Sequence, residues 1–461
     1  MNKKIGYTLM MALICVVGGA CANVEETGVA VEKDIDESKV EVVAEAERDL
    51  EGLVVTIASW ATVAEPEVKA SAHEEALWEY RHQMMEKYNF EVEEIGVTDW
   101  KQSLETFSTE TITGDPAAEV YRIHADFLAG ALNSGLATDL TTLESIDLTE
   151  PKWNQVVQKY MSKDGGVYGF GSASNGTRVL FFNKAILESI GLNENVLYDL
   201  QVSGEWTWKK FEEISELVTR DTNNDGANDI FAVPADTIDM YKIAVLSNEG
   251  SYVNMDEDGM LYNATMEPNS LEAIEWLSNY YEKDYEHPST SYFEQQELFA
   301  AGKIAMYVGG ISEVPKFARE MKDDFGVVCF PKGPKASQYA AGTTSPAWVI
   351  PNTYTKEEAE DIAFVLDIWT NEPPGYDGED DWMVAQYPKY RDKRAVEETL
   401  ALLKEPGVMR PEYDMLISTG IDVDSWGKKI YNKIQTPIEA LEAVEAVWQI
   451  EIDKFNEAKS E

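Results

Sequence analysis

Strand-like and helix-like patterns alternate along the chain from about residue 53 onward. Short runs rich in β-branched and aromatic residues indicate strands, and apolar residues three or four positions apart indicate helices. The predicted strands are residues 53–60, 90–95, 118–123, 178–182, 303–308 and 325–330. The predicted helices are residues 70–88, 99–108, 125–132, 184–190, 208–218, 270–281, 356–370 and 436–458. This alternation predicts an α/β fold with mainly parallel sheets flanked by helices, in which ligands bind beyond the carboxyl ends of the strands.

Composition and charge narrow the choice of function. The chain has 84 acidic and 38 basic residues, a formal net charge of −46, which argues against nucleic acid and anionic lipid as partners. Cys329 is the only cysteine after residue 21, which excludes an internal disulfide framework and a cysteine metal cluster. Nucleophile-elbow, P-loop and HExxH motifs are absent. A carboxylate pair for glycoside hydrolysis stays open, because acidic residues are too numerous to single out two.

The first residues have the three parts of an export signal. Lys3 and Lys4 precede an uncharged, mainly apolar stretch, and small residues lead to Cys21. The arrangement resembles a bacterial lipoprotein signal, in which the cysteine is lipidated, although Gly18 stands where the pattern prefers leucine. We therefore expect residues 1–21 to be a signal peptide and the protein to be anchored to the outer face of the cell membrane through Cys21. The alternative is an ordinary cleaved signal in which Cys21 is incidental.

Residues 22–52 differ from the rest of the chain. They are rich in Asp and Glu and contain no aromatic residue. Such a segment buries too little apolar surface to offset its ordering entropy. We expect it to be a flexible tether.

Four segments together resemble the extracellular solute-binding proteins of sugar ABC importers, the group that includes maltose-binding protein. Residues 114–140 resemble the family's strand and helix that deliver ligand-facing residues. Residues 168–192 contain Leu-Phe-Phe-Asn-Lys and Gly-Leu, similar to the family's "YNK…GL" segment, and residues 206–211 resemble its "TW..F" helix start. Residues 299–310 resemble its "GkaAM…G" strand.

The resemblance implies a two-lobed, periplasmic-binding-protein-like α/β fold, with the lobes joined by a hinge. Lobe 1 would comprise residues 53–172 and 338–415, and lobe 2 residues 173–337 and 416–461. The protein would capture a sugar or oligosaccharide between the lobes and deliver it to the transmembrane subunits of an ABC permease. It would be a monomer, not an enzyme, and would require no cofactor. The alternatives are a secreted carbohydrate-active enzyme, a ligand-sensing subunit of a membrane receptor, and a binding protein for a non-sugar solute such as a polyamine.

Sugar recognition needs flat aromatic faces for C–H surfaces and polar groups for hydroxyls. Trp60 ends the first predicted strand, and His124 and Asp126 follow the strand that ends at Ile123; Asp126 is alternatively a helix N-cap. By the resemblance, Gly310 is followed at Ile311 by a position that often holds an aromatic residue, so a stacking platform is missing there. The further candidate ligand residues are Asn175, alternatively a plain loop residue, and Trp348, Trp382 and Trp426, the last two in segments that look irregular.

Residues 221–229 have the spacing of the start of an EF-hand loop. The oxygen-bearing positions 1, 3, 5 and 9 are Asp221, Asn223, Asp225 and Asp229, with glycine at position 6. Ala227 stands at position 7, which contributes a backbone carbonyl in such loops, but the glutamate of position 12 is missing. The loop therefore predicts a structural calcium site, with an Asx-rich turn as the alternative.

Overall fold

The computed structural model describes residues 48–69, 71–173, 177–342, 345–376, 378, 381–417 and 422–460. The predicted signal peptide with Cys21, most of the predicted tether, and Asn175 lie outside the described residues. Within the described part of the chain, no helix is both long enough and apolar enough to cross a membrane.

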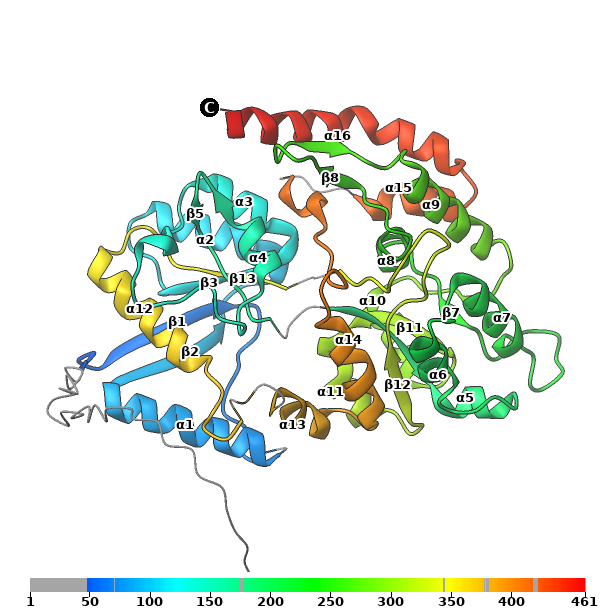
Figure 1. Cartoon of the computed structure of the whole chain (residues 1–461), viewed down its shortest axis with the longest axis horizontal. Coiled ribbons are helices and arrows are strands. Elements are labelled where there is room, and N and C mark those ends of the chain that lie inside the picture. Colours follow the sequence, from blue (N-terminus) through cyan, green and yellow to red (C-terminus); the bar gives the residue numbers. More distant parts are fainter. Residues whose placement is uncertain are drawn as a thin grey trace, which may run out of the picture. The chain divides into compact units, whose positions relative to one another are not determined.

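The first sheet has the strand order β13-β3-β1-β2. Strands β1 (Leu53–Ser59), β2 (Phe90–Gly96) and β3 (Val120–Ile123) are parallel, and β13 (Ala347–Val349) runs antiparallel to β3. Helices α1 (Ala72–Tyr88) and α12 (Lys356–Trp369) cover one face, against Val55 and Ile57. Helices α2 (Ser103–Ile112) and α3 (Leu128–Ser134) cover the other, against Ala58 (Figure 1). The side-chain alternation along β1 thus produces one apolar core on each face.

The second sheet has the order β11-β6-β12 and corrects the expectation of two mainly parallel sheets. Strand β6 (Arg178–Asn183) is fully buried and runs antiparallel to both β11 (Met306–Gly310) and β12 (Phe325–Val328). The direction follows from the chain path: β6 starts at Arg178, which pairs with Gly310 at the end of β11. Strand β6 therefore begins at the edge of the sheet where β11 and β12 end.

The remaining elements surround these two sheets. The helices are α4 (Gln155–Tyr160), α5 (Lys184–Ser189), α6 (Val196–Ser203), α7 (Trp208–Val218), α8 (Asp239–Ser247), α9 (Pro268–Tyr281), α10 (Tyr292–Ala300), α11 (Val314–Glu320), α13 (Asp381–Gln386), α14 (Ala401–Leu403), α15 (Val423–Tyr431) and α16 (Pro437–Ser460). The short strand pairs are β4 (Ser162–Lys163) with β5 (Gly166–Val167), β7 (Val233–Pro234) with β10 (Glu286–His287), and β8 (Val253–Met255) with β9 (Leu261–Asn263). The single turns are η1 (Trp100–Gln102), η2 (Ala125–Phe127), η3 (Leu140–Thr142), η4 (Ile311–Glu313), η5 (Tyr387–Lys389) and η7 (Tyr413–Leu416), and the π-helical segment η6 is Ala395–Leu400.

Three chain segments that connect elements of the first sheet to the second run side by side. The Arg178 N–H donates to the Gly342 carbonyl at 3.2 Å. The neighbouring Ala341 N–H donates to Val408, and the Arg410 N–H donates back to Ala341. These backbone hydrogen bonds hold positions together that are far apart in sequence.

The folded body begins earlier than the predicted end of the tether. The Arg48 Nε donates to Asp361 at 3.1 Å, and its guanidinium lies 4.3 Å from the centroid of the Phe364 ring, on α12. Leu50 is buried in the core beneath α12. Residues 48–52 therefore pack onto the first sheet's helices, and the predicted boundary at residue 52 is too late.

Candidate functional site

Aromatic side chains gather at the carboxyl edge of the first sheet. Trp60 follows β1, and its ring centroid lies 5.8 Å from that of His124, which follows β3. The His124 ring is 4.5 Å from Trp100 and 6.1 Å from Phe127. We call Trp60, Trp100, His124 and Phe127 the aromatic cluster. Parallel neighbouring strands end at the same edge, which explains why two predicted residues, Trp60 and His124, meet here.

Charged and polar groups border the aromatic cluster. The Arg122 guanidinium lies 4.6 Å from the centroid of the Trp60 ring and donates to Glu94 at 3.1 Å. Among the described residues, neither the Arg122 Nε nor the Ser59 Oγ has a hydrogen-bond partner, although both atoms are buried. Ser59 and Arg122 directly follow Ala58 and Tyr121, the last residues that pair β1 with β3. An unpaired buried polar group costs about 1–3 kcal/mol, so these two atoms mark an unsatisfied polar spot at this edge of the sheet.

His124 and Asp126 lie in contact, and their roles differ from the predicted alternative. The N-cap of η2 is His124, whose Nδ1 accepts from the Asp126 N–H at 3.4 Å. The Asp126 carboxylate lies 3.5 Å from the same nitrogen and is exposed. Burial lowers the pKa of His124; Asp126 opposes this, while the positive charges of Lys242 and Arg122 lower the pKa further. The edge thus offers a neutral imidazole beside an exposed carboxylate.

On the second sheet, a buried carboxylate organises the end of β11. Glu313 accepts hydrogen bonds from the Gly310 N–H (2.8 Å), the Tyr307 hydroxyl (2.9 Å), the Tyr292 hydroxyl (2.6 Å) and Gln296 (2.7 Å). A Cβ on the preceding Gly309 would lie 2.5 Å from the Glu313 carboxylate and 2.4 Å from the Tyr307 ring.

Sterics therefore require glycine at position 309, whereas a Cβ on Gly310, a predicted ligand residue, would meet no atom closer than 3.2 Å. Ile311 begins η4 and is partly exposed. The sequence motif pointed to this turn but not to Glu313, which becomes recognisable only from its four donors.

Buried charges lie between the two sheets. Arg178 donates to Asp239 at 2.6 Å and to Glu412 at 2.7 Å. Burial alone would lower the pKa of Arg178, but the two carboxylates raise it overall, so the guanidinium stays charged. Lys242, one turn along α8 from Asp239, lies 3.9 Å from Asp414 in η7. No sequence pattern singled out these residues.

Of the other predicted ligand residues, Trp348 lies beside the aromatic cluster, whereas Trp382 and Trp426 belong to other elements. Trp348 on β13 pairs in register with Arg122 and packs edge-on against Phe170 at 5.6 Å. Trp382 lies on α13, with the Lys404 ammonium 4.1 Å from its ring.

Trp426 is fully buried on α15 and packs against Tyr241 and Tyr252. Trp426 is therefore a core residue. The expectation that Trp382 and Trp426 stand in irregular segments is wrong, because each lies in a helix that buries apolar side chains.

The predicted calcium loop uses its oxygen atoms internally. Asp221 accepts from the N–H groups of Asn223, Asn224 and Gly226, and Asp229 accepts from Thr222 and Asn223. Among the described residues, no group of three or more His, Cys, Asp or Glu side chains is arranged to hold a metal ion. The arrangement is that of the alternative Asx-rich turn, and calcium remains a prediction.

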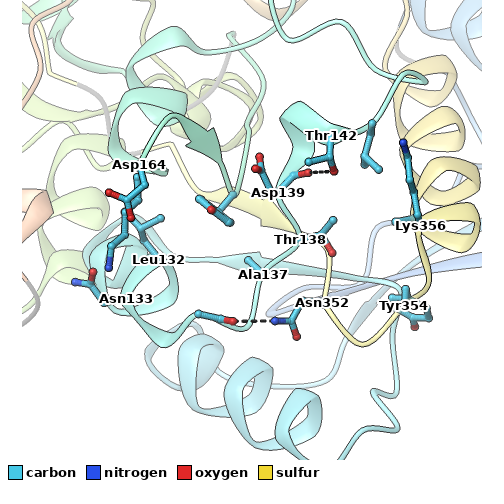
Figure 2. Close-up of a pocket in the computed structure, with 15 residues that line it drawn as sticks. Leu132, Asn133, Ala137, Thr138, Asp139, Thr142, Asp164, Asn352, Tyr354 and Lys356 are labelled. Carbon is cyan, nitrogen blue, oxygen red and sulfur yellow. Dashed lines mark hydrogen bonds between the residues drawn. The ribbon is translucent and has the colours of Figure 1, made fainter. Parts of the chain in front are cut away.

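A separate pocket of about 560 Å³ lies on the first sheet's body (Figure 2). Asp139, Lys163, Asp164, Asn352 and Lys356 are among its lining residues. None of the predicted ligand residues lines this pocket, and its aromatic lining residues are Tyr168 and Tyr354. We therefore take the aromatic cluster, which has both flat faces and unpaired polar atoms, as the candidate site.

Comparisons with known proteins identify the family of the chain. Residues 79–375, more than half of the chain, match the family model described as "Bacterial extracellular solute-binding protein". The polygalacturonan/rhamnogalacturonan-binding protein YtcQ of Bacillus subtilis (strain 168) is 24% identical over 225 residues, which cover 45% of this chain. The match spans 43% of that relative's length.

Solved structures of similar proteins share the fold. UgpB from Mycobacterium tuberculosis, in complex with glycerophosphocholine, has a TM-score of 0.65 at 18% identity over 87% of this chain and 98% of that one. The ABC substrate-binding protein Lmo0181 from Listeria monocytogenes, in complex with cycloalternan, has a TM-score of 0.60 at 19% identity over 89% of this chain and 99% of that one. These likenesses confirm the predicted fold class.

Proposed function

Because the chain belongs to the family of bacterial extracellular solute-binding proteins, we propose that it captures a sugar or oligosaccharide and delivers it to the transmembrane subunits of an ABC importer. The family is one of binding proteins, so the chain is not an enzyme. Support for a carbohydrate comes from the name of YtcQ and from the cycloalternan complex of the Listeria protein. The glycerophosphocholine complex of UgpB shows that other solutes suit this fold.

The observation that carries the proposal is the aromatic cluster with its polar border. A pyranose has apolar C–H faces that stack on indole rings, and its hydroxyl groups need both donors and acceptors. Trp60 and Trp100 offer the rings. Arg122 offers a partly exposed guanidinium as donor, and Asp126 an exposed carboxylate as acceptor. Each hydroxyl can therefore be satisfied while the ring face leaves water.

A cationic solute such as a polyamine fits this edge less well. The Arg122 guanidinium already lies over Trp60, 4.6 Å from its centroid, which is the position that a ligand cation would take. Lys242 adds a second positive charge close enough to lower the pKa of His124, after the larger effect of burial. We therefore prefer a carbohydrate to a polyamine. A sensing role uses the same binding step and is separated from import by a pull-down of the membrane partner.

The test is a binding panel on the mature protein. Thermal shifts and isothermal titration would use mannotriose, trigalacturonate, cycloalternan, glycerophosphocholine and spermidine. A ligand at 100 times its Kd stabilises the folded state by about 2.7 kcal/mol, which is readily seen as a shift in melting temperature. We expect at least one oligosaccharide to bind; binding of spermidine or glycerophosphocholine alone would overturn the proposal.

The variant Trp60→Ala tests the location of the site. We expect it to weaken oligosaccharide binding at least tenfold, which corresponds to about 1.4 kcal/mol. Trp78→Ala is a matched control, because Trp78 is also partly exposed, has Arg81 5.0 Å from its ring and packs edge-on against another aromatic residue, but lies on α1. Equal weakening by both variants would place the site elsewhere.

A further inference from the structure

We propose that the pocket of about 560 Å³ on the first sheet's body is a second binding site, which takes a short neutral carbohydrate. It is separate from the aromatic cluster and goes beyond the proposed function, because a solute held in this pocket stays at the protein's surface and does not enter the transport site. The volume lies within the range of about 300–1,000 Å³ that is usual for small-molecule sites.

The pocket lies at the opposite edge of the first sheet from the aromatic cluster. Strand β13 starts at Ala347, which pairs with Ile123 at the end of β3, and runs antiparallel to β3. The chain after β13 therefore reaches the edge where β3 begins, and there the Tyr354 hydroxyl donates to the Ala118 carbonyl at 3.4 Å. The aromatic cluster follows the other ends of β1 and β3. A solute in one site thus leaves the other site free.

The floor of the pocket is formed by two segments that are distant in sequence and bonded to each other. The Thr138 N–H donates to Ile350 and the Asn352 N–H donates to Leu136, both at 2.8 Å. The side-chain amide of Asn352 also donates to the Gly135 carbonyl at 2.8 Å (Figure 2). Because these bonds fix the floor in the free protein, little entropy is lost there when a ligand binds.

The sides of the pocket come from a hairpin and a helix start. The Asp139 Oδ1 accepts from the Val167 N–H of β5 at 3.2 Å and from the Thr141 N–H at 3.0 Å, which ties the β4–β5 hairpin to the floor. Asp164 lies in the turn of that hairpin, and Lys356 is the first residue of α12. Figure 2 shows Asp164 and Lys356 on opposite sides of the pocket.

The charges around the pocket are balanced. Its charged lining residues are two lysines and two aspartates, Lys163, Lys356, Asp139 and Asp164. The whole chain, by contrast, has a formal net charge of −46. A solute cation would meet two ammonium groups here and a solute anion two carboxylates, so neither gains from its net charge. The lining therefore favours an uncharged solute with many polar groups.

The polar atoms of the lining match the needs of sugar hydroxyls, which both donate and accept. Among the described residues, the side chains of Asn133, Lys163 and Lys356 form no hydrogen bond or ion pair. Burial, and then the charges of Asp139 and Asp164, raise the pKa of Tyr168, so its hydroxyl stays protonated and can donate. The carboxylate of Asp164 is exposed and can accept.

Apolar surface for the C–H faces of a sugar is also present. The rings of Tyr168 and Tyr354 are half-buried, and flat aromatic faces of this kind can stack on a pyranose. Leu132, Leu143 and Ala359 are buried in the same lining. Rings, donors and acceptors thus meet in one hollow, as a carbohydrate requires.

The experiment counts binding events by isothermal titration. The probes are the neutral sugars mannotriose and cycloalternan, the acidic sugar trigalacturonate, and the zwitterion glycine betaine. We expect Trp60→Ala, which weakens binding at the aromatic cluster, to retain a second event with at least one neutral sugar. Adding Lys163→Ala or Lys356→Ala should weaken that event at least tenfold. In the otherwise wild-type chain, each lysine variant should leave the first event within twofold.

Lys209→Ala is the matched control, because Lys209 is also an exposed lysine in the first turn of a helix, α7, and it should leave both events unchanged. Stability should stay at the wild-type value in Lys163→Ala and Lys356→Ala, since neither side chain has a bonded partner among the described residues. Urea unfolding verifies this.

Different failures have different meanings. If no neutral sugar shows an event that the lysine variants weaken, the second site is wrong, and binding that Trp60→Ala weakens still supports the proposed function. A second event with trigalacturonate or glycine betaine alone would overturn the assignment to a neutral carbohydrate. Equal weakening by Lys209→Ala and Lys356→Ala would place the second event outside this pocket. An event that only the pocket variants weaken would support the second site while the proposed function falls.

Discussion

Arg178 and Glu412 form a buried ion pair of 2.7 Å although 234 residues separate them in the chain. Arg178 begins β6, and Glu412 lies on one of the segments that connect the two sheets. The Glu412 N–H also donates to the hydroxyl of Tyr160, on α4. A Cβ on Gly342 would lie 2.1 Å from the Glu412 carboxylate, so the third connecting segment also approaches this pair closely. The pair thus ties the connecting segments together.

Removing the charge of Glu412 should destabilise the fold. In Glu412→Gln, the buried Arg178 keeps only Asp239 as a carboxylate partner, and breaking one partner of a buried pair costs about 3–5 kcal/mol. Urea unfolding monitored by circular dichroism measures the change. Lys209→Ala is the control, because the ion pair of Lys209 with Glu213 is solvent-exposed and contributes little. Equal stability of Glu412→Gln and the wild type would contradict the role of the pair.

Stability should depend on pH through Glu286. Burial raises the pKa of this carboxyl group to about 7, from an ordinary value of 4.5, and its buried Oε2 has no hydrogen-bond partner among the described residues. Between these values the unfolded chain releases the proton while the folded chain retains it. The contribution of Glu286 to the free energy of unfolding is therefore largest below about pH 4.5. It is lost as the pH rises from 4.5 to about 7.

The variant Glu286→Gln removes this titration. We expect it to be more stable than the wild type at pH 8 and to show a smaller loss of stability between pH 5 and pH 8, measured by urea unfolding. Glu445→Gln, on the exposed side of α16, is the control and should follow the wild type. The same pH dependence in Glu286→Gln and the wild type would contradict the assignment.

Gly309 and Gly310 should respond differently to a methyl group. In Gly309→Ala, the new Cβ would lie 2.4 Å from the Tyr307 ring and 2.5 Å from Glu313, so the turn must shift, at a cost of about 1–3 kcal/mol. In Gly310→Ala, the nearest atom is the mobile hydroxyl of Ser312 at 3.2 Å, and the change should be smaller. Thermal unfolding compares the two; a larger loss for Gly310→Ala would show that the turn is packed differently.

The loop of residues 221–229 is predicted to bind calcium. We expect calcium chloride, but not magnesium chloride, to raise the melting temperature of the wild type. Asp225→Asn is the most informative variant, because the amide oxygen of the new asparagine can still accept from the Ala227 N–H although the negative charge is lost. It should fold normally and lose the response to calcium. No heat of calcium binding to the wild type would leave the loop as an Asx-rich turn.

Lipidation of Cys21 is predicted from the signal motif. Labelled palmitate supplied to expressing cells should enter the wild-type protein and not Cys21→Ser, and only the wild type should sediment with the membrane fraction. Cys329→Ser is the control, because Cys329 is buried in the second sheet's body. Label in Cys21→Ser would show that this cysteine is not the acceptor.

Local patterns along the chain were enough to predict most helices and strands and the family. The helix predicted at residues 208–218 is observed with Thr207 as its N-cap, and Gly191 follows α5 in the left-handed conformation. Trp60, His124 and Asp126, which the sequence places just after predicted strands, lie at one edge of the sheet because the parallel strands β1 and β3 end there. Hydrophobic spacing, capping residues and motif order carry such information, since each depends on neighbours within a few positions.

The partners that residues find across the fold could not be predicted in this way. Trp426 appeared to stand in an irregular segment, yet packing buries it against Tyr241 and Tyr252. Glu313 and Tyr292 are ordinary residues in the sequence, and their meeting at the end of β11 is fixed by how α10 packs on the sheet. Likewise, the direction of β6 between its neighbours follows from the path by which the chain enters the second sheet. Spacing along the chain contains no signal for contacts between residues that only three-dimensional packing brings together.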